Sequence, residues 1–236
     1  MVKFFERLPG VLACMSERGD GSMRRFPGDP VDARNKRSRE AFLGRNGIDP
    51  RSVIIPELIH GTYVAKIAQG SDPILRDTDG LVTNKTGLYL SVTVADCLPV
   101  LFYDPDDRAV GLAHAGWRGL LGGILPNAVR GLEDMGGDTQ KVRVEIGPGI
   151  QKCHYEIRTA DKRLYQDYRE YVMERDGRVF VDLPGMAEEQ LKRAGVLPGH
   201  ITKSHLCTYC EEKHFFSYRR DKPQKIEAQI TLIGLK

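Results

Sequence analysis

The feature that most constrains the fold of this chain is an apolar run between residues 88 and 114. Its first part, LYLSVTVADCLPVLFY (88–103), is rich in β-branched and aromatic residues and is broken only at Asp96–Pro99. A second apolar segment, AVGLAH (109–114), follows shortly afterwards. Short apolar runs separated by turn residues are typical of buried strands. We therefore expect three consecutive strands here. Cys97 lies in the break between the first two, and His114 ends the third.

Helical and strand patterns alternate along the rest of the chain. Helical patterns cover residues 31–45 (ending near Gly47), 118–133, 160–175 and 185–194. Further strands are expected at 52–60, 81–83, 141–147, 200–204 and 226–234. No repeat, low-complexity tract or linker divides the sequence. Alternating strands and helices predict an α/β or α+β class, with a mixed sheet flanked by helices. We expect a single domain over residues 1–236.

The overall composition excludes several classes of protein. Hydrophobic residues make up 41% and charged residues 28%, which is ordinary for a globular chain and unlike a collagen, a coiled coil or a disordered protein. The longest apolar stretches run about ten residues, far short of the ~20 that a membrane span needs. The first ten residues, MVKFFERLPG, lack the apolar core of a secretory signal. These observations predict a cytoplasmic protein with no membrane partner.

The charge balance also argues against a nucleic-acid partner. Lysine and arginine number 35 against 32 aspartates and glutamates, and the basic residues are scattered. The richest basic run, RNKRSR (34–39), is interpreted as the solvated face of a helix. The charge pattern therefore predicts no nucleic-acid partner, and an RNA-binding patch at this run is the alternative.

The five cysteines do not predict a disulfide framework, because the number is odd and the composition resembles that of a cytosolic protein. Cys207 and Cys210 form a C-x-x-C pair, which alone suggests a structural zinc site or a redox pair; a zinc site would need His205 and His214 to complete four ligands. The alternative is that Cys207 packs in the wall or core of a site. Cys153 stands beside His154, and Cys14 is expected in the core.

Three potential metal ligands stand where predicted strands meet turns. Cys97 follows one apolar strand, His114 ends another, and His60 ends the run VIIPELI. Histidine and cysteine are ligand types that zinc prefers, and three protein ligands leave a fourth tetrahedral position open, as in catalytic sites. Taken singly, each residue has another interpretation: Cys97 as a small buried hydrophobe, and the histidines as hydrogen-bonded core residues.

Four motifs, taken in order, connect this sequence to a known family. They are ADCLPVLF (95–102), HAGWRG (114–119), IGPGIQKCHYEI (146–157) and CTY with FFSYRRD (207–221). On these motifs the sequence resembles the laccase-domain family, also called the polyphenol-oxidase or purine nucleoside phosphorylase family, over residues 11–234. It departs from the family pattern at Leu58, where glutamine is usual, and at Cys210, where serine is usual.

The resemblance implies a zinc site formed by His60, Cys97 and His114 in an α/β fold. It also implies phosphorolysis of adenosine, inosine, guanosine and methylthioadenosine, together with adenosine deamination. The implied substrates are purine nucleosides and inorganic phosphate. A true multicopper laccase is rejected, because four coppers need roughly ten histidines. This chain has six histidines and no His-X-His pair. Oxidase activity would then come from adventitious copper in the Cys/His site.

Other residues are candidates for substrate binding, and their roles stay open. Arg118, at the start of a predicted helix, would bind phosphate or pair with a carboxylate such as Asp96. Asp96 would orient a ligand, act as a general acid or base, or have a structural role. Arg219, followed by Arg220, offers a second guanidinium. Trp117 would stack on a purine base or pack against the sheet, and Tyr155 is expected in the core.

Two other functions remain alternatives at this stage. Cys97 as a nucleophile, with a histidine as its base, would make a thiol hydrolase. A non-catalytic binding protein would keep zinc only for stability. The sequence leaves open whether the protein is a monomer or a homodimer.

Overall fold

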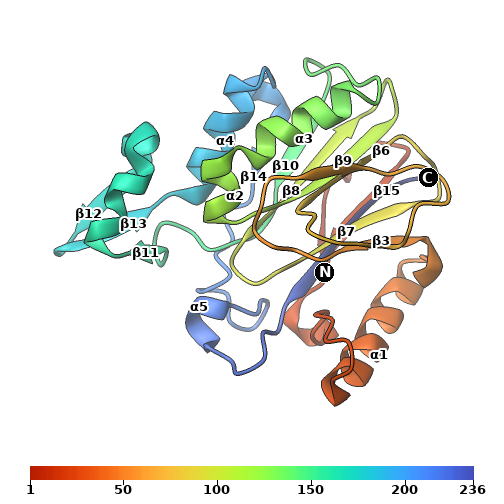
Figure 1. The fold of residues 1–236 in the computed structure, drawn as a ribbon, viewed down its shortest axis with the longest axis horizontal. Coiled ribbons are helices and arrows are strands. Elements are labelled where there is room, and N and C mark those ends of the chain that lie inside the picture. The colour runs from red at the N-terminus through yellow and green to blue at the C-terminus, as the bar shows by residue number, and fades with distance from the viewer.

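The computed structural model describes all 236 residues of the chain. Two six-stranded sheets are stacked face to face, with helices covering the outer face of each. In Figure 1, α2, α3 and α4 lie on one side of the stacked sheets and α1 on the other. The order of layers is therefore helix, sheet, sheet, helix, and the predicted class, α/β with mixed sheets flanked by helices, is confirmed.

The sheet covered by α2, α3 and α4 carries most of the residues singled out above. Its strands, in spatial order, are β14 (Ile201–Lys203), β10 (Arg143–Ile146), β8 (Leu98–Asp104), β9 (Ala109–Ala115), β6 (Gly80–Thr83) and β4 (Val64–Lys66). β8, β9 and β6 are antiparallel neighbours, whereas β14 and β4 pair in parallel at the two edges.

The other large sheet is built mainly from the two ends of the chain. Its strands, in spatial order, are β1 (Val2–Lys3), β2 (Val11–Met15), β15 (Gln229–Leu235), β7 (Tyr89–Val94), β3 (Val53–Pro56) and β5 (Ile74–Leu75). The C-terminal strand β15 lies between β2 and β7 and pairs antiparallel with both. The N- and C-terminal segments are therefore locked together in one layer.

The chain forms five α-helices and four 3₁₀ segments. The α-helices are α1 (Pro30–Arg45), α2 (Trp117–Gly122), α3 (Ile124–Glu133), α4 (Leu183–Arg193) and α5 (Tyr218–Asp221); the 3₁₀ helices are η1 (Arg18–Asp20), η2 (Pro50–Ser52), η3 (Thr159–Tyr171) and η4 (Pro198–His200). The α1 helix starts where Asp29 accepts a hydrogen bond from the backbone N–H of Val31, with proline at the first helical position. No helix combines the length and the apolar content that crossing a membrane requires.

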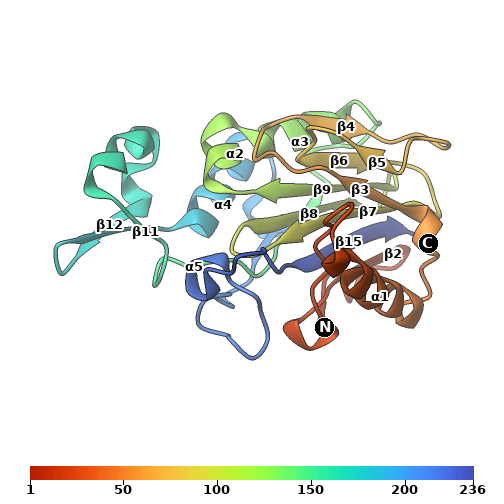
Figure 2. The same ribbon diagram turned by 60° about the horizontal axis from the view of Figure 1, so that its bottom comes forward.

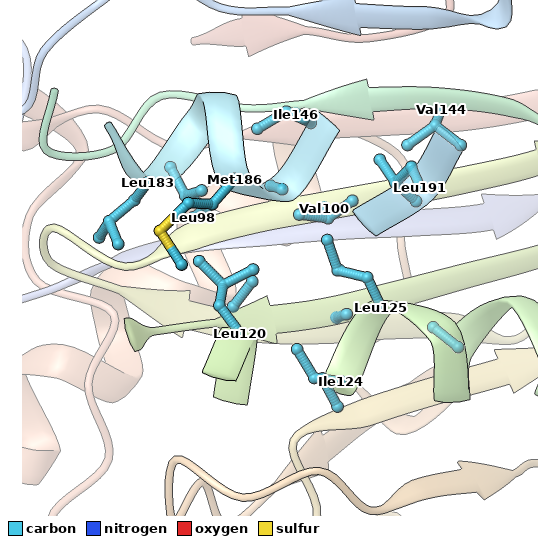
Figure 3. Close-up of a cluster of buried hydrophobic side chains, with 14 of the residues drawn as sticks. Leu98, Val100, Leu120, Ile124, Leu125, Val144, Ile146, Leu183, Met186 and Leu191 are labelled. Atoms are coloured by element: carbon cyan, nitrogen blue, oxygen red, sulfur yellow. The ribbon is translucent and has the colours of Figure 1, made fainter. Parts of the chain in front are cut away.

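The strands β8 and β9 are mainly apolar because both faces of their sheet are covered. Leu98, Val100 and Phe102 of β8 pack against the helices, whereas Leu101 and Tyr103 face the other sheet. Figure 3 shows the helical side of this core, where leucines of α2, α3 and α4 point at β8 and β10. The long apolar run of the sequence is thus a consequence of double-sided burial.

The helix expected over residues 118–133 is divided in two. Gly123 has a φ of 89° and ends α2 in the left-handed conformation before α3 begins. Glycine is the residue that adopts this conformation without steric cost, so the chain turns there while keeping helical segments on both sides.

The prediction of a helix over residues 160–175 is wrong for its last four residues. Residues 159–171 form the 3₁₀ segment η3, in which Tyr165 and Tyr168 leave helical geometry. Residues 172–175 instead form strand β12, within a three-stranded sheet of order β11 (Glu156–Ile157), β13 (Arg178–Val181) and β12 (Val172–Arg175). Asp176 and Gly177 both have positive φ and connect β12 to β13 in a two-residue turn. Figure 2 shows this small sheet projecting from one end of the stacked sheets.

Candidate functional site

The structure brings together three side chains that are distant in sequence. His60 lies in the loop between β3 and β4, Cys97 in the turn between β7 and β8, and His114 near the end of β9. Their potential ligand atoms all lie within 4.8 Å of one another. The antiparallel register explains part of this meeting, because Leu98 pairs with Ala115 and so places Cys97 beside the end of β9.

Asp79 connects two of these elements and was not singled out from the sequence. It directly precedes β6, whose register with β9 pairs Gly80 with Ala113 and so sets Asp79 opposite His114. Its Oδ1 lies 2.8 Å from Nδ1 of His114, and both residues are buried. A carboxylate on one imidazole nitrogen fixes the tautomer and leaves Nε2 as the nitrogen available to a metal.

The same carboxylate also holds the loop that carries His60. Asp79 accepts hydrogen bonds from the backbone N–H groups of Ile59, His60 and Gly61, at 3.1, 3.0 and 2.7 Å. His60 has a φ of 61°, a left-handed conformation that is uncommon for a residue with a β-carbon. The three hydrogen bonds stabilise this strained backbone and direct the imidazole toward its partners.

Two glycines of the HAGWRG segment allow the close approach of these elements. A β-carbon on Gly116 would lie 2.9 Å from Sγ of Cys97 and 3.2 Å from Cδ2 of His60. A β-carbon on Gly119 would lie 3.1 Å from the carbonyl oxygen of Gly61. Any larger residue at Gly116 would therefore push apart the two side chains that meet there.

The electrostatics of the cluster favour a thiolate beside an imidazolium. Burial opposes ionisation of Cys97, but the charge and hydrogen bonds of His114 and His60 outweigh it and lower the pKa of the thiol to about 6. Burial likewise disfavours a charged His114, but Cys97 and Asp79 outweigh it and raise the pKa of the imidazole to about 9. A divalent cation would replace the proton between these groups.

Solvent reaches the cluster from the side of His60. The side chain of His114 is only 3% exposed, Cys97 is half-buried, and His60 is exposed. The rings of the two histidines meet edge to face, with centroids 4.8 Å apart. A small molecule can therefore approach the cluster past His60, while His114 and Asp79 stay dry.

Asp96 is occupied by contacts within the protein. Its Oδ1 accepts a hydrogen bond from the hydroxyl of Thr208 and its Oδ2 accepts one from the backbone N–H of Arg219, both at 2.7 Å. Its φ of 90° is strained, as at His60. The carboxylate thus connects the turn that carries Cys97 to the C-terminal SYRRD segment.

The arginines of interest have different surroundings. Arg118 lies in the first turn of α2, is exposed, forms no ion pair with Asp96, and lies 4.3 Å from the centroid of the Trp117 ring. Trp117 itself packs against the core below the helices. Arg219 donates from one guanidinium nitrogen to the carbonyl of Glu156 and lies over the ring of Tyr155. Tyr155 is buried, as expected.

The C-x-x-C pair does not meet the histidines that the sequence suggested. His205 is exposed, and His214 lies 3.5 Å from Glu17 instead. Cys207 and Cys210 are gathered with Cys153 and His154, and all four potential ligand atoms lie within 4.8 Å of one another. The sequence contains both pairs but does not show that they meet, because more than 50 residues separate Cys153 from Cys207.

The donor set of the first cluster fits a catalytic metal centre. Two imidazoles and one thiolate are a zinc ligand set, and three ligands leave a position open toward solvent. Asp79 holds the imidazole of His114 in place, and the absence of a side chain at Gly116 lets Cys97 and His60 come close to each other. The position of Asp79 is the sequence signal for this role, because the residue directly precedes the short apolar strand β6, which pairs with the strand β9 that carries His114.

Comparison with known proteins places the chain in a family. Residues 22–236 match the family described as multi-copper polyphenol oxidoreductase laccase. A purine nucleoside phosphorylase of Deinococcus radiodurans is 35% identical over 168 residues, which cover 70% of this chain and 64% of that protein. The chain therefore spans less than two thirds of that relative's length. An adenosine deaminase, RL5, from an unknown prokaryote is 30% identical over 74% of this chain and 72% of its own length.

A solved structure agrees with these sequence matches. The hypothetical protein YfiH of Bacillus licheniformis superposes with a TM-score of 0.86 at 29% identity, covering 96% of this chain and 93% of that one. The family description mentions copper, whereas the relatives bear the names of nucleoside enzymes. The chain belongs to the laccase-domain family, and the suspected membership is confirmed.

Proposed function

We propose that this protein is a zinc-dependent purine nucleoside phosphorylase that also deaminates adenosine. The proposed nucleosides are adenosine, inosine, guanosine and methylthioadenosine. The observation that carries the proposal is the three-ligand cluster of His60, Cys97 and His114, backed by the buried carboxylate of Asp79. The names of the relatives support the choice of substrate class.

Within the cluster, each residue has a separate task. Zinc, when bound, would supply a Lewis acid with one open position for a water molecule or a substrate group. Asp79 holds the proton of His114 on Nδ1, which leaves Nε2 free to ligate. Cys97 ligates as a thiolate at neutral pH, because the two histidines lower its pKa. His60 completes the set from the solvent side.

The proposed anion site involves two arginines, the exposed Arg118 and the half-buried Arg219. The guanidinium of Arg118 is exposed and free of carboxylate partners, so it is available to an incoming phosphate. Arg219 keeps donors that the carbonyl of Glu156 does not use. Asp96 would contribute to substrate binding by positioning Arg219 through its backbone N–H.

The two reactions make different demands on such a site. In phosphorolysis, a phosphate oxygen bonds to C1′ of the sugar while the C1′–N9 bond breaks, and the purine leaves with its electron pair and gains a proton. In deamination, water adds to C6 of the purine and ammonia departs. The arginines would bind phosphate for phosphorolysis. The cluster of His60, Cys97 and His114 would activate water for deamination and would orient the nucleoside in both reactions.

The test measures phosphate-dependent release of free purine from a nucleoside panel, with metal content determined on the same preparation. We expect phosphate-dependent turnover and zinc at this cluster in the wild type, and we expect His114→Ala to lose the zinc of this cluster and to lower turnover at least 100-fold. His200→Ala, which lies outside both Cys/His clusters, is the matched control and should keep both. Full turnover by zinc-free protein would refute the proposal.

A cysteine hydrolase is a second candidate, favoured by one observation. The pKa of about 6 at Cys97 makes this thiol a thiolate at neutral pH even without a metal. Alkylation by iodoacetamide separates the two functions. If Cys97 is a ligand, zinc protects it and activity follows zinc content; if it is a nucleophile, alkylation abolishes activity regardless of zinc.

The proposal includes a cytoplasmic location. All five cysteines are free thiols in the structure, a state that a reducing compartment maintains. The oligomeric state, monomer or homodimer, can be read from light scattering of the same preparation.

A further inference from the structure

The second Cys/His cluster, formed by Cys153, His154, Cys207 and Cys210, lies outside the site described above. We propose that it is a closed, four-ligand zinc site with a structural role. All four potential ligand atoms lie within 4.8 Å of one another. Three thiolates and one imidazole are a donor set of structural zinc sites, which offer no open position for chemistry. This inference does not depend on the proposed enzymatic activity.

The distances within the cluster approach those of a tetrahedral zinc centre. Zn–S bonds of about 2.3 Å and Zn–N bonds of about 2.0 Å give tetrahedral edges of about 3.8 Å between sulfurs and about 3.5 Å between sulfur and nitrogen. Sγ of Cys153 lies 3.7 Å from Sγ of Cys210, and Nδ1 of His154 lies 3.3 Å from each of these sulfurs. Small adjustments would therefore admit the ion.

The fold holds the two halves of the cluster together from the backbone. Gly149 and Cys207 form a parallel bridge, in which the N–H of Thr208 donates to the carbonyl of Gly149 at 3.1 Å. The backbone N–H of Gln151 points at Sγ of Cys207, 3.4 Å away. Outer contacts of this kind hold metal ligands in place.

The imidazole is oriented as a ligand by its neighbour. The ring of His154 stacks on Tyr209 at a centroid distance of 4.0 Å and an interplanar angle of 13°. Tyr209 lies inside the C-x-x-C segment, so the same turn that supplies two sulfurs also sets the plane of the histidine. His154 and Tyr209 are half-buried, Cys207 is buried and Cys210 is exposed, which leaves a path for the ion to enter.

The surroundings balance the charge of such a centre. Three thiolates, one neutral imidazole and Zn²⁺ carry a net charge of about −1. A cavity of about 240 Å³ next to Cys153 and His154 is lined by Arg175, Arg219 and Lys222, and by Arg178, which pairs with Glu156 of the same lining. One of them, Arg175, also donates to the carbonyl of Cys153. Positive charge beside the cluster would offset its net charge.

The site would fasten the loop before β11 to the segment before α5. The hydroxyl of Thr208, next to Cys207, binds Asp96, and Arg220 donates to the carbonyls of Thr208 and Tyr209. An ion at this point would therefore stiffen the contacts that connect the C-terminal segment to the turn carrying Cys97.

The test is the zinc stoichiometry of the full-length protein, purified under reducing conditions with zinc supplied. We expect two zinc ions per chain in the wild type. Cys210→Ser and His60→Ala should each hold one zinc ion, and the variant that combines both substitutions should hold none. Cys14→Ser removes a buried thiol far from both clusters and should keep two. Equal zinc in the wild type and Cys210→Ser would overturn the proposal.

A cobalt titration of the metal-free wild type gives a second measurement that does not need a variant to fold. Thiolate-to-cobalt charge-transfer absorption grows with the number of sulfur ligands, so saturation of both sites should give about four times the absorption of a one-thiolate site. Absorption from a single thiolate at saturation, or a Cys153–Cys210 disulfide in protein that holds one zinc, would overturn the assignment. When only the cluster of His60, Cys97 and His114 is disrupted, as in His60→Ala, the cobalt absorption of a three-thiolate site should remain.

Discussion

The carboxylate of Asp79 connects the imidazole of His114 to the backbone of residues 59–61 by hydrogen bonds. It accepts three backbone hydrogen bonds and faces Nδ1 of His114. Burial by itself would raise the pKa of Asp79, but the hydrogen bonds from His114 and Gly61 outweigh it and lower the pKa. The group is therefore an anion at neutral pH, matched to a protonated nitrogen.

We expect Asp79→Asn to lower zinc affinity at the first cluster about 10- to 100-fold, because an amide N–H facing Nδ1 moves the imidazole proton to Nε2. Competition with a chromophoric chelator measures the affinity. Asp104→Asn is the control, since Asp104 is equally buried and accepts backbone hydrogen bonds from Asp106, Asp107 and Asp138 away from the cluster. An unchanged affinity in Asp79→Asn would show that the carboxylate does not orient the ligand.

At the scale of elements, the short helix α5 is held by charge and hydrogen bonding. Ser217 caps it by accepting from the N–H of Arg220, and Asp221 at its end accepts from the backbone N–H of Ser217. Asp221 also pairs with Arg220 and with Arg18 of η1. Partial burial raises the pKa of Asp221, but Arg220, Ser217 and Arg18 outweigh it and lower the pKa.

This shift predicts a pH-dependent contribution to stability. A lowered folded-state pKa contributes stability that is complete above the unfolded pKa of about 3.9 and is lost as pH falls through the folded value. Asp221→Asn should therefore reduce the free energy of unfolding by about 1–3 kcal/mol at pH 7. The difference in the free energy of unfolding between the wild type and Asp221→Asn should become smaller as the pH falls below 4. Urea unfolding at several pH values measures it.

The control for this series is Asp167→Asn, at an exposed aspartate in η3 that forms no ion pair or hydrogen bond. Its free energy of unfolding should follow that of the wild type at every pH. A gap for Asp221→Asn that stays constant down to the acid limit would show that packing, and not the charge of the carboxylate, stabilises α5.

The elements that sequence patterns missed were short and held by partners distant in sequence. The sequence pattern predicts the end of a helix at β12, although the Asp176-Gly177 turn that follows it is a strong hairpin signal. β4 and β5 have three and two residues, too few for an alternation to be visible. Only pairing with longer neighbours makes such segments strands.

At the scale of the whole molecule, the two stacked sheets form the framework that positions the cluster. Leu112 of β9 is fully buried between them, two residues from His114. β8 and β9 are covered by helices on the outer face and by the other sheet on the inner face, so few adjustments are open to them. Rigid packing around a strand end keeps a ligand in place.

We expect Leu112→Ala to lower the free energy of unfolding by about 2–5 kcal/mol, because the cavity it leaves between the sheets cannot collapse. Urea denaturation followed by circular dichroism gives the value. Leu164→Ala, at a leucine that is 44% exposed in η3, serves as the comparison and should cost less than about 1 kcal/mol. Similar losses in both variants would contradict the double-sided packing of β9.

The sequence alone was enough to predict the class of fold and the three central strands, and it supplied the candidate ligands His60, Cys97 and His114. These properties are local: apolar runs, turn residues and the chemistry of single side chains can be read without knowing partners. The tertiary structure decided which side chains meet. It set Asp79 opposite His114 through strand register, and it joined Cys207 and Cys210 to Cys153 and His154 in place of His205 and His214. Long-range pairing of this kind depends on the packing of the whole chain, which no local pattern encodes.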